Sequence, residues 1–236
     1  MKSITCILLL TSLLVSLINV DSQAQYRSEK GKKNKYRFNA GLMLGINFSQ
    51  IDGDNFSGFN KRGLQASLKG MIYLNKKWDV TTGITFVQRG SRFEDHRTGI
   101  LDKNSRKIHL DYVEVPLLLT YKKLQQNGRG VRLDIGGSFA RLFNSKVEEV
   151  ITPFSEVFSY GTLEEQYTNN EFNVLAGASY FFNRRIAIGF QFTYQLNKLY
   201  DNPAFSYDPL TWCRPFKDVE HLRNYQFGVQ LIYHLL

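Results

Sequence analysis

Cysteine is nearly missing from this chain, which has two among its 236 residues, Cys6 and Cys213. Cys6 lies in an N-terminal segment that we expect to be removed, so one cysteine would be left and an intramolecular disulfide is excluded. The same scarcity excludes a zinc site built from paired cysteines. Stability is therefore expected from strand pairing and packing.

Long hydrophobic runs are also lacking. The one apolar stretch, Ile7–Ile18, is interrupted by hydroxyl residues and is too short for a membrane-spanning helix of about 20 residues. Lys2 precedes it and small residues lead to Ala24, as in a secretory signal peptide. We predict a signal peptide at 1–24, a basic periplasmic N-terminal segment at 25–35, and a single domain at 36–236.

The net charge of +9 is concentrated partly in residues 27–37, which contain six lysines and arginines. An exported chain without a nucleic-acid recognition motif is not expected to bind nucleic acid. The basic segment is interpreted either as a solvated tail or as a contact for anionic lipid headgroups or an acidic partner.

Period-2 alternation is the strongest signal that is present. Between Arg185 and Asn197 large apolar residues alternate with small or polar ones, which is typical of a strand with two different faces. The pattern recurs in seven more segments. The predicted strands span about 36–48, 63–74, 78–89, 109–121, 131–140, 172–182, 185–197 and 224–235.

The connections between these segments alternate in length, at roughly 14, 3, 17, 8, 28, 2 and 26 residues. Long external loops and short periplasmic turns are typical of outer-membrane barrels. We therefore predict an all-β fold, an eight-stranded antiparallel transmembrane β-barrel with up-and-down meander topology. It would lie in the outer membrane of a Gram-negative cell with both termini periplasmic.

A soluble eight-stranded barrel is the structural alternative, and it would turn the large apolar residues inward. Glycine on the polar face argues against it, because a narrow interior needs small residues whereas a solvated exterior does not. These glycines are Gly41, Gly45, Gly83, Gly136, Gly177, Gly189 and Gly228.

Four ordered motifs resemble the PorT-like outer-membrane β-barrel domain family, also called porin family. They are GLMLGINFSQIDGD (41–54), GFNKRG (58–63), VQRGSR (87–92) and LDYVEVPL (110–117). The resemblance covers nearly the whole mature chain and implies an eight-stranded barrel in the outer membrane. The best-known member of that family is an accessory of the type IX secretion system, and most relatives have no assigned role.

Eight strands leave a lumen that side chains can fill, so no open pore is expected. The predicted polar cluster of the lumen comprises Lys69, Arg89, Glu114, Arg132 and Asp134. Strands four and five are neighbours, which predicts that Glu114, Arg132 and Asp134 lie together. Packed ion pairs are one interpretation of this cluster, and a proton or ion path is the other.

Catalytic signals are weak. None of the four histidines has a nucleophile or carboxylate partner nearby in the sequence, and Asp52-Gly53-Asp54-Asn55 fits turn chemistry better than a calcium loop. We expect neither enzymatic activity nor a cofactor or metal, and no substrate is assigned.

The third and fourth long loops carry aromatic residues that could contact partners, among them Tyr160, Tyr167, Tyr207 and Trp212. Packing of these residues on one another as a lid is the alternative. The functional hypothesis is a structural or binding role through the external loops, with outer-membrane lipid and envelope-complex proteins as partners. The other hypotheses are an accessory subunit of a type IX-like secretion or assembly complex and a narrow ion or small-solute channel.

Overall fold

The computed structural model describes residues 38–53, 58–94, 105–125, 127–150, 167–201 and 221–235. The predicted signal peptide and basic segment lie outside these ranges, as do Tyr160, Tyr207 and Trp212. The chain divides into two units, Met1–Lys35 and Tyr36–Leu236, and every described residue belongs to the second. In these ranges no helix has the length and apolar character needed to cross a membrane.

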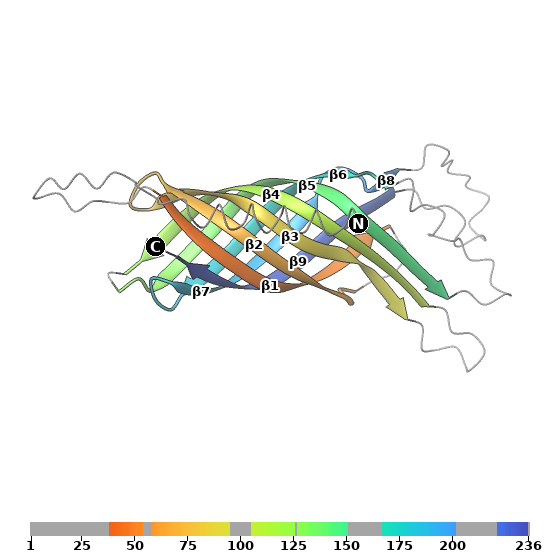
Figure 1. The fold of residues 1–236 in the computed structure, drawn as a ribbon, viewed down its shortest axis with the longest axis horizontal. Coiled ribbons are helices and arrows are strands. Elements are labelled where there is room, and N and C mark those ends of the chain that lie inside the picture. The colour runs from red at the N-terminus through yellow and green to blue at the C-terminus, as the bar shows by residue number, and fades with distance from the viewer. Residues whose placement is uncertain are drawn as a thin grey trace, which may run out of the picture. The chain divides into compact units, whose positions relative to one another are not determined.

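Eight long strands close into an antiparallel barrel (Figure 1), which confirms the predicted fold. Each strand pairs with the next, and β9 closes the ring by pairing with both β7 and β1. The two-residue β8 adds to the edge of β9. The strands are β1 (Phe38–Asp52), β2 (Lys61–Tyr73), β3 (Trp78–Glu94), β4 (Ser105–Leu124), β5 (Gly130–Val150), β6 (Asn170–Phe181), β7 (Ile186–Gln195), β8 (Tyr200–Asp201) and β9 (His221–His234).

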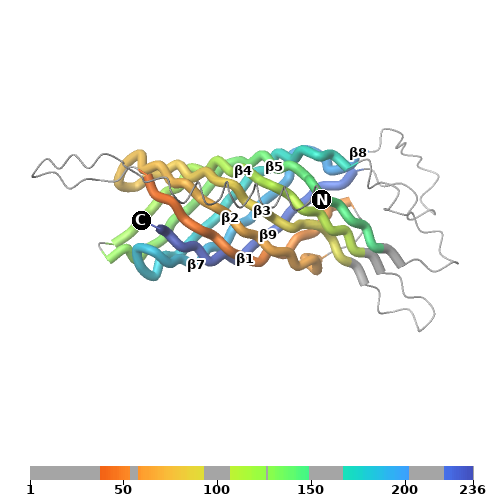
Figure 2. The backbone as a smooth tube through the Cα atoms, in the orientation of Figure 1, coloured from red at the N-terminus to blue at the C-terminus, as the bar shows by residue number. Residues whose placement is uncertain are grey.

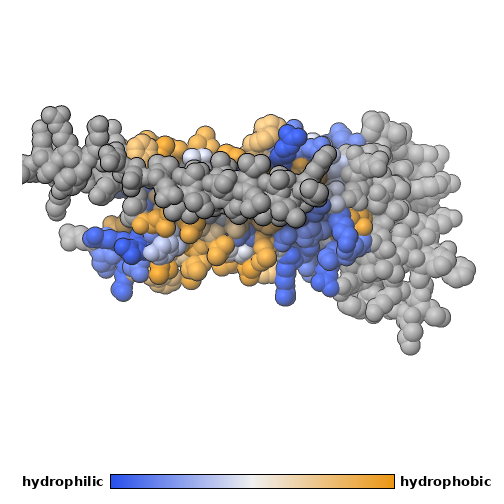
Figure 3. All heavy atoms as spheres, in the orientation of Figure 1, coloured by the Kyte–Doolittle hydropathy of each residue, from blue (hydrophilic) through white to orange (hydrophobic). Residues whose placement is uncertain are grey.

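The predicted faces are also confirmed along the middle of the barrel. Large apolar side chains point outward and are exposed, as with Leu117 at 64% and Ile135 at 61%, whereas Leu118 on β4 and Arg132 on β5 point inward and are buried. Figure 3 shows the outward residues as an orange belt with hydrophilic residues at both ends. We call this belt the apolar band. An outward apolar belt of this kind matches the hydrocarbon layer of a membrane.

Three short connections lie at one end of the barrel, at 74–77, 125–129 and 182–185. The first residues of β1 and the last of β9 lie at this same end, because Gly41 is paired with His234 and Phe38 with Ile72. We call it the short-turn end and the opposite one the long-loop end.

Strands β3, β4 and β5 continue at the long-loop end well beyond the predicted limits (Figure 2). β5 ends at Val150, so 19 residues rather than 28 separate it from β6, and ten rather than 17 separate β3 from β4. The ladder continues where the outward apolar residues stop, with Ile108 paired to Val147. A register shift between Asp111 and Tyr112 marks the change.

Glycines on the inner face sit where neighbouring strands approach closely. A Cβ atom built at Gly136 would lie 2.1 Å from the carbonyl oxygen of Leu117, and one at Gly83 would lie 2.2 Å from that of Leu68. These contacts are with backbone atoms, which cannot rotate away. The sequence-based inference that the inner face has little room is therefore confirmed at these positions.

Gly136→Ala is expected to lower the free energy of unfolding by about 1–3 kcal/mol, since the methyl group would force the β4–β5 ladder apart. The measurement is urea unfolding of the full chain in lipid vesicles. Gly70→Ala is the matched control, because its Cβ would lie 4.0 Å from the nearest atom, the carbonyl oxygen of Thr82, which is an ordinary contact. Equal losses for both variants would contradict the close-approach explanation.

Candidate functional site

The upper part of the lumen, toward the long-loop end, holds a buried triad of charges. Arg89 Nη1 donates to Glu171 Oε2 at 2.6 Å, and Nη2 donates to Glu114 Oε2. Asn224 Nδ2 donates to Glu171 Oε1 at 2.6 Å and lies 3.2 Å from the Tyr112 hydroxyl. Arg89 is 1% exposed and Glu171 0%, so the triad is sealed from water. Each charge of the triad is stabilised by the others, because no water is present to solvate a charge that loses its partner.

The predicted sixth strand begins at residue 172 and so leaves Glu171 in the preceding long connection, and this was wrong. β6 begins at Asn170, and its alternation turns Glu171 inward beside the outward Phe172. The alternation of this strand already predicted an inward position, because Glu171 immediately precedes the first large outward residue.

The lower part of the lumen, toward the short-turn end, is built around Asp79. This carboxylate contacts Lys122 Nζ through Oδ1 and Arg132 Nη2 through Oδ2, the latter at 3.5 Å. Arg132 Nη1 lies 3.3 Å from Nε2 of His234, whose Nδ1 is 3.5 Å from Asn39 Nδ2. Four strands and the C-terminal end of β9 thus meet in one polar network.

Side chains fill the middle of the lumen between these two parts. Lys69 Nζ donates to Gln230 Oε1 at 3.5 Å, and Thr120 Oγ1 donates to Asp134 Oδ1 at 2.5 Å. The cavity beside Lys69 has a volume of about 10 Å³. That is at most the space of one water molecule.

The five residues of the predicted polar cluster all lie in the lumen, but they do not form one cluster. Arg89 and Glu114 belong to the upper part, Arg132 to the lower part, and Lys69 and Asp134 to the middle. The prediction that Glu114, Arg132 and Asp134 lie together is right for Arg132 and Asp134, which are two residues apart on the inner face of β5, but wrong for Glu114. Asp134 is paired with Thr120, six residues along β4 from Glu114, and this separates them by roughly 20 Å.

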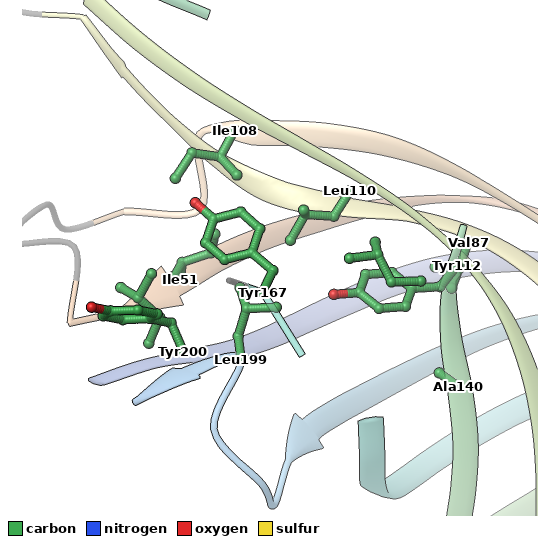
Figure 4. Close-up of a cluster of buried hydrophobic side chains, with 11 residues drawn as sticks. Ile51, Val87, Ile108, Leu110, Tyr112, Ala140, Tyr167, Leu199 and Tyr200 are labelled. Carbon is green, nitrogen blue, oxygen red and sulfur yellow. The ribbon is translucent and has the colours of Figure 1, made fainter. Parts of the chain in front are cut away.

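Above the apolar band the two faces of the barrel exchange character. The inward residues become apolar and form a buried cluster (Figure 4). The outward residues become polar, and we call them the outer collar. The buried cluster comprises Ile51, Val87, Ile108, Leu110, Tyr112, Ala140, Leu142, Tyr167, Leu199, Tyr200 and Leu222. The outer collar comprises Gln88, Arg92, Lys107, His109, Asp111, Asn144, Lys146 and Glu148. We call the cluster and collar together the head.

Hydrogen bonds order the outer collar around Asp111. Its two carboxylate oxygens accept from His109 Nε2 at 2.9 Å, Gln88 Nε2 at 3.1 Å and Asn144 Nδ2 at 2.8 Å. The prediction that no histidine has a carboxylate partner nearby in the sequence was therefore wrong for His109. With Nε2 donating, His109 Nδ1 is free to accept from Lys61 Nζ at 2.7 Å. Burial lowers the pKa of Lys61 from its usual value. The network fixes side chains that would otherwise be mobile on a strand surface.

Charged residues continue the outer collar away from the bilayer side. Glu148 lies 2.7 Å from Lys146 Nζ and 3.4 Å from Lys107 Nζ. The hydrogen bond from Lys146 and then that from Lys107 lower the pKa of Glu148 from its usual value. These side chains are exposed, so they are available to an external partner.

Tyr167 was predicted to contact partners, but it is 5% exposed and packs inside the head (Figure 4). Of the two interpretations of the loop aromatics, self-packing applies to this residue. Tyr160, Tyr207 and Trp212 lie outside the described ranges. Among the described residues no group of three His, Cys, Asp or Glu side chains is arranged to hold a metal ion.

Residues 23–201 match the family model described as outer membrane protein beta-barrel domain. Similar solved structures include Ail, the attachment invasion locus protein of Yersinia pestis, in complex with the heparin analogue sucrose octasulfate. It has 12% identity and a TM-score of 0.40, covering 85% of this chain and all of that one. The N-terminal β-barrel domain of Pseudomonas aeruginosa OprF has 8% identity and a TM-score of 0.33, covering 83% and 98%. Neisserial surface protein A has 10% identity and a TM-score of 0.36, covering 84% and 97%. The comparison with curated proteins gave no match.

Proposed function

We propose, from the premise that this chain belongs to the outer membrane protein beta-barrel domain family, that it binds envelope partners through its head and has no catalytic activity. The family places the barrel in the outer membrane. We further propose that the short-turn end and both termini are periplasmic, so that the head is external. The supporting feature is that the long connections of the described barrel all leave from the head.

The exchange of faces above the apolar band carries this proposal. A strand that only spans a bilayer has no reason to continue with polar residues outside and apolar residues inside, since that is the pattern of a water-soluble barrel. β4 and β5 do continue in this way, from His109 to Lys107 and from Asn144 to Glu148. The head is therefore a rigid platform beyond the membrane surface, and rigid side chains lose little entropy on binding.

The narrow channel is the second hypothesis, and the packed lumen argues against it. The mid-lumen cavity beside Lys69 has a volume of only about 10 Å³, and Lys69 Nζ donates to Gln230 Oε1, which supports a closed lumen in the described barrel. We therefore propose that the barrel does not conduct.

The purified full chain is expected to give no conductance steps in a planar lipid bilayer, because the lumen side chains are fixed by ion pairs and hydrogen bonds. Glu114→Gln and Lys69→Gln provide the comparison. Steady conductance that changes with either substitution would contradict the proposal and support the channel.

Binding through the head is tested by purification of the tagged protein from outer membranes in mild detergent, followed by mass spectrometry. Lys107→Glu with Lys146→Glu is expected to reduce co-purifying proteins at least tenfold, through charge reversal on the outer collar. Lys76→Glu with Lys77→Glu changes the same charge at the short-turn end and should have no effect. The proposal would be contradicted if no protein co-purified with the barrel, or if both double variants reduced the co-purifying proteins equally. Stoichiometric large companions would favour the accessory-subunit role in a secretion or assembly complex.

A further inference from the structure

Two arginines point outward at the edge of the apolar band nearest the head. Arg62 lies on β2 and Arg141 on β5, and both side chains are exposed. Within the part of the chain that the structure describes, neither guanidinium group has a hydrogen bond, an ion pair or a ring contact with the protein. Their charges are therefore available to a group outside the protein.

Apolar outward residues surround Arg141. Phe139 and Phe143 flank it on β5, and Val113 is its paired residue on β4; all three are exposed. Phe139 packs on Phe172 of β6, with ring centroids 5.5 Å apart. An arginine on the outer face of a barrel is costly at the middle of the bilayer and nearly neutral at its surface. The stem of Arg141 can therefore lie among these rings if its charged end lies among lipid headgroups.

Arg62 has similar surroundings. It is paired with the outward Phe48 of β1, and Leu64 lies two residues further along β2 on the same face. Phe48 stacks on Phe227 of β9, with ring centroids 5.1 Å apart. Each arginine thus combines an apolar, aromatic surface with a cation that no protein group neutralises.

The strand register puts the two arginines at the same height on the barrel. Following paired residues from Phe38 through β2 once round the eight strands leads back to β1 at Phe48, ten residues nearer the head. This climb amounts to about four residues over the three steps from β2 to β5. The row through Arg62, continued from the β2–β3 register, reaches β5 at Lys146, and Arg141 lies four paired positions below it. The climb and the offset cancel, so both side chains leave the barrel at one level.

We propose that Arg62 and Arg141 each bind the phosphate group of a lipid in the leaflet next to the head, with the acyl chains of that lipid against the apolar band. A guanidinium group donates two parallel N–H bonds to the oxygens of a phosphate. A membrane lipid carries its anionic phosphate directly beside its apolar chains, which matches a cation set beside aromatic rings. These sites lie below the outer collar. They go beyond the proposed function and do not depend on protein binding by the head.

Lys198 provides the control for the test. It follows β7 at the head, and its Nζ is already paired with Asp201 Oδ1 at 2.8 Å. Arg62→Gln and Arg141→Gln remove a charge that has no protein partner, whereas Lys198→Gln removes a charge that has one. Neither arginine has a side-chain bond to lose, so both arginine variants are expected to fold normally.

The experiment is native mass spectrometry of the full chain in a neutral detergent, titrated with dioctanoyl phosphatidic acid. Arg62→Gln and Arg141→Gln are each expected to weaken one binding step about tenfold, the effect of losing a charge-assisted hydrogen bond. The double variant should retain two fewer lipids than the unsubstituted chain, and Lys198→Gln should change binding by less than about twofold. Unchanged binding by the double variant, or an equally large loss with Lys198→Gln, would overturn the sites.

Two further ligands separate the parts of the lipid. Dioctanoylglycerol has the same chains without the phosphate, and inorganic phosphate has no chains. We expect the first not to bind in place of phosphatidic acid, and the second not to displace it at equal concentration. Equal binding of dioctanoylglycerol would show that the aromatic surface acts without the arginines. Displacement by inorganic phosphate would show that the arginines bind a free anion. Either result would overturn the assignment to a lipid phosphate.

Discussion

Arg89→Met is expected to lower the free energy of unfolding by about 3–5 kcal/mol, the effect of removing one partner from a buried ion pair. Without the guanidinium group, Glu114 and Glu171 would face each other in a lumen with no solvent. Both carboxylates are buried, Glu171 completely. Urea unfolding of the full chain in lipid vesicles measures the loss, and the unheated form on a gel reports whether the barrel still closes.

The triple variant Arg89→Met, Glu114→Gln, Glu171→Gln separates charge from packing. It removes all three charges and keeps similar volumes, so most of the lost stability should return. If the triple variant is as unstable as Arg89→Met alone, the destabilisation comes from lost packing against Tyr112, whose ring lies 5.2 Å from the Arg89 central carbon. A loss below about 1 kcal/mol for the single variant would show that water reaches the triad.

The sequence predicts the barrel well because one physical rule governs its middle. Lipid outside and a narrow interior force large apolar residues to alternate with small or polar ones, as in Ile186–Gln195. The same rule predicts that Lys69, Arg89, Glu114, Arg132 and Asp134 point inward, and all five do. It does not give the height of each residue, because height depends on register and tilt, which alternation leaves open.

Register explains why the predicted contacts among the lumen charges differ from the observed ones. Glu114 meets Arg89 across the β3–β4 pair and Glu171 completes the triad from β6, across the barrel. Such contacts join residues up to 82 positions apart in the sequence. No local sequence pattern predicts these contacts. Once β6 is known to begin at Asn170, the alternation of the strand does place the Glu171 side chain inward.

The limits of the strands were missed for a different reason. Alternation with apolar residues outward was the criterion for a strand, and this criterion fails where the surroundings change from lipid to water. On β5 the outward residues after the predicted end are Arg141, Phe143, Asn144 and Lys146, so polar residues dominate the outer face while the ladder to β4 continues. The end of the predicted strand therefore marks the edge of the apolar band and not the end of the strand.

Ile135→Arg is expected to lower the free energy of unfolding by about 2–4 kcal/mol, the effect of placing an arginine near the middle of the bilayer on an outward face. Asn144→Arg is the matched control on the same strand and the same face. It lies in the outer collar, where arginine can still donate to Asp111, so its effect should be below about 1 kcal/mol. Urea unfolding in vesicles measures both variants.

The difference between the two variants locates the membrane surface on the barrel. If lipid reached the head, Asn144→Arg would be as costly as Ile135→Arg, and the platform beyond the membrane would not exist. If the cost falls steeply between Ile135 and Asn144, the change from Phe143 to Asn144 is the boundary between lipid and water. Everything beyond it on β3, β4 and β5 would then be exposed on one side of the membrane, as binding through the head requires.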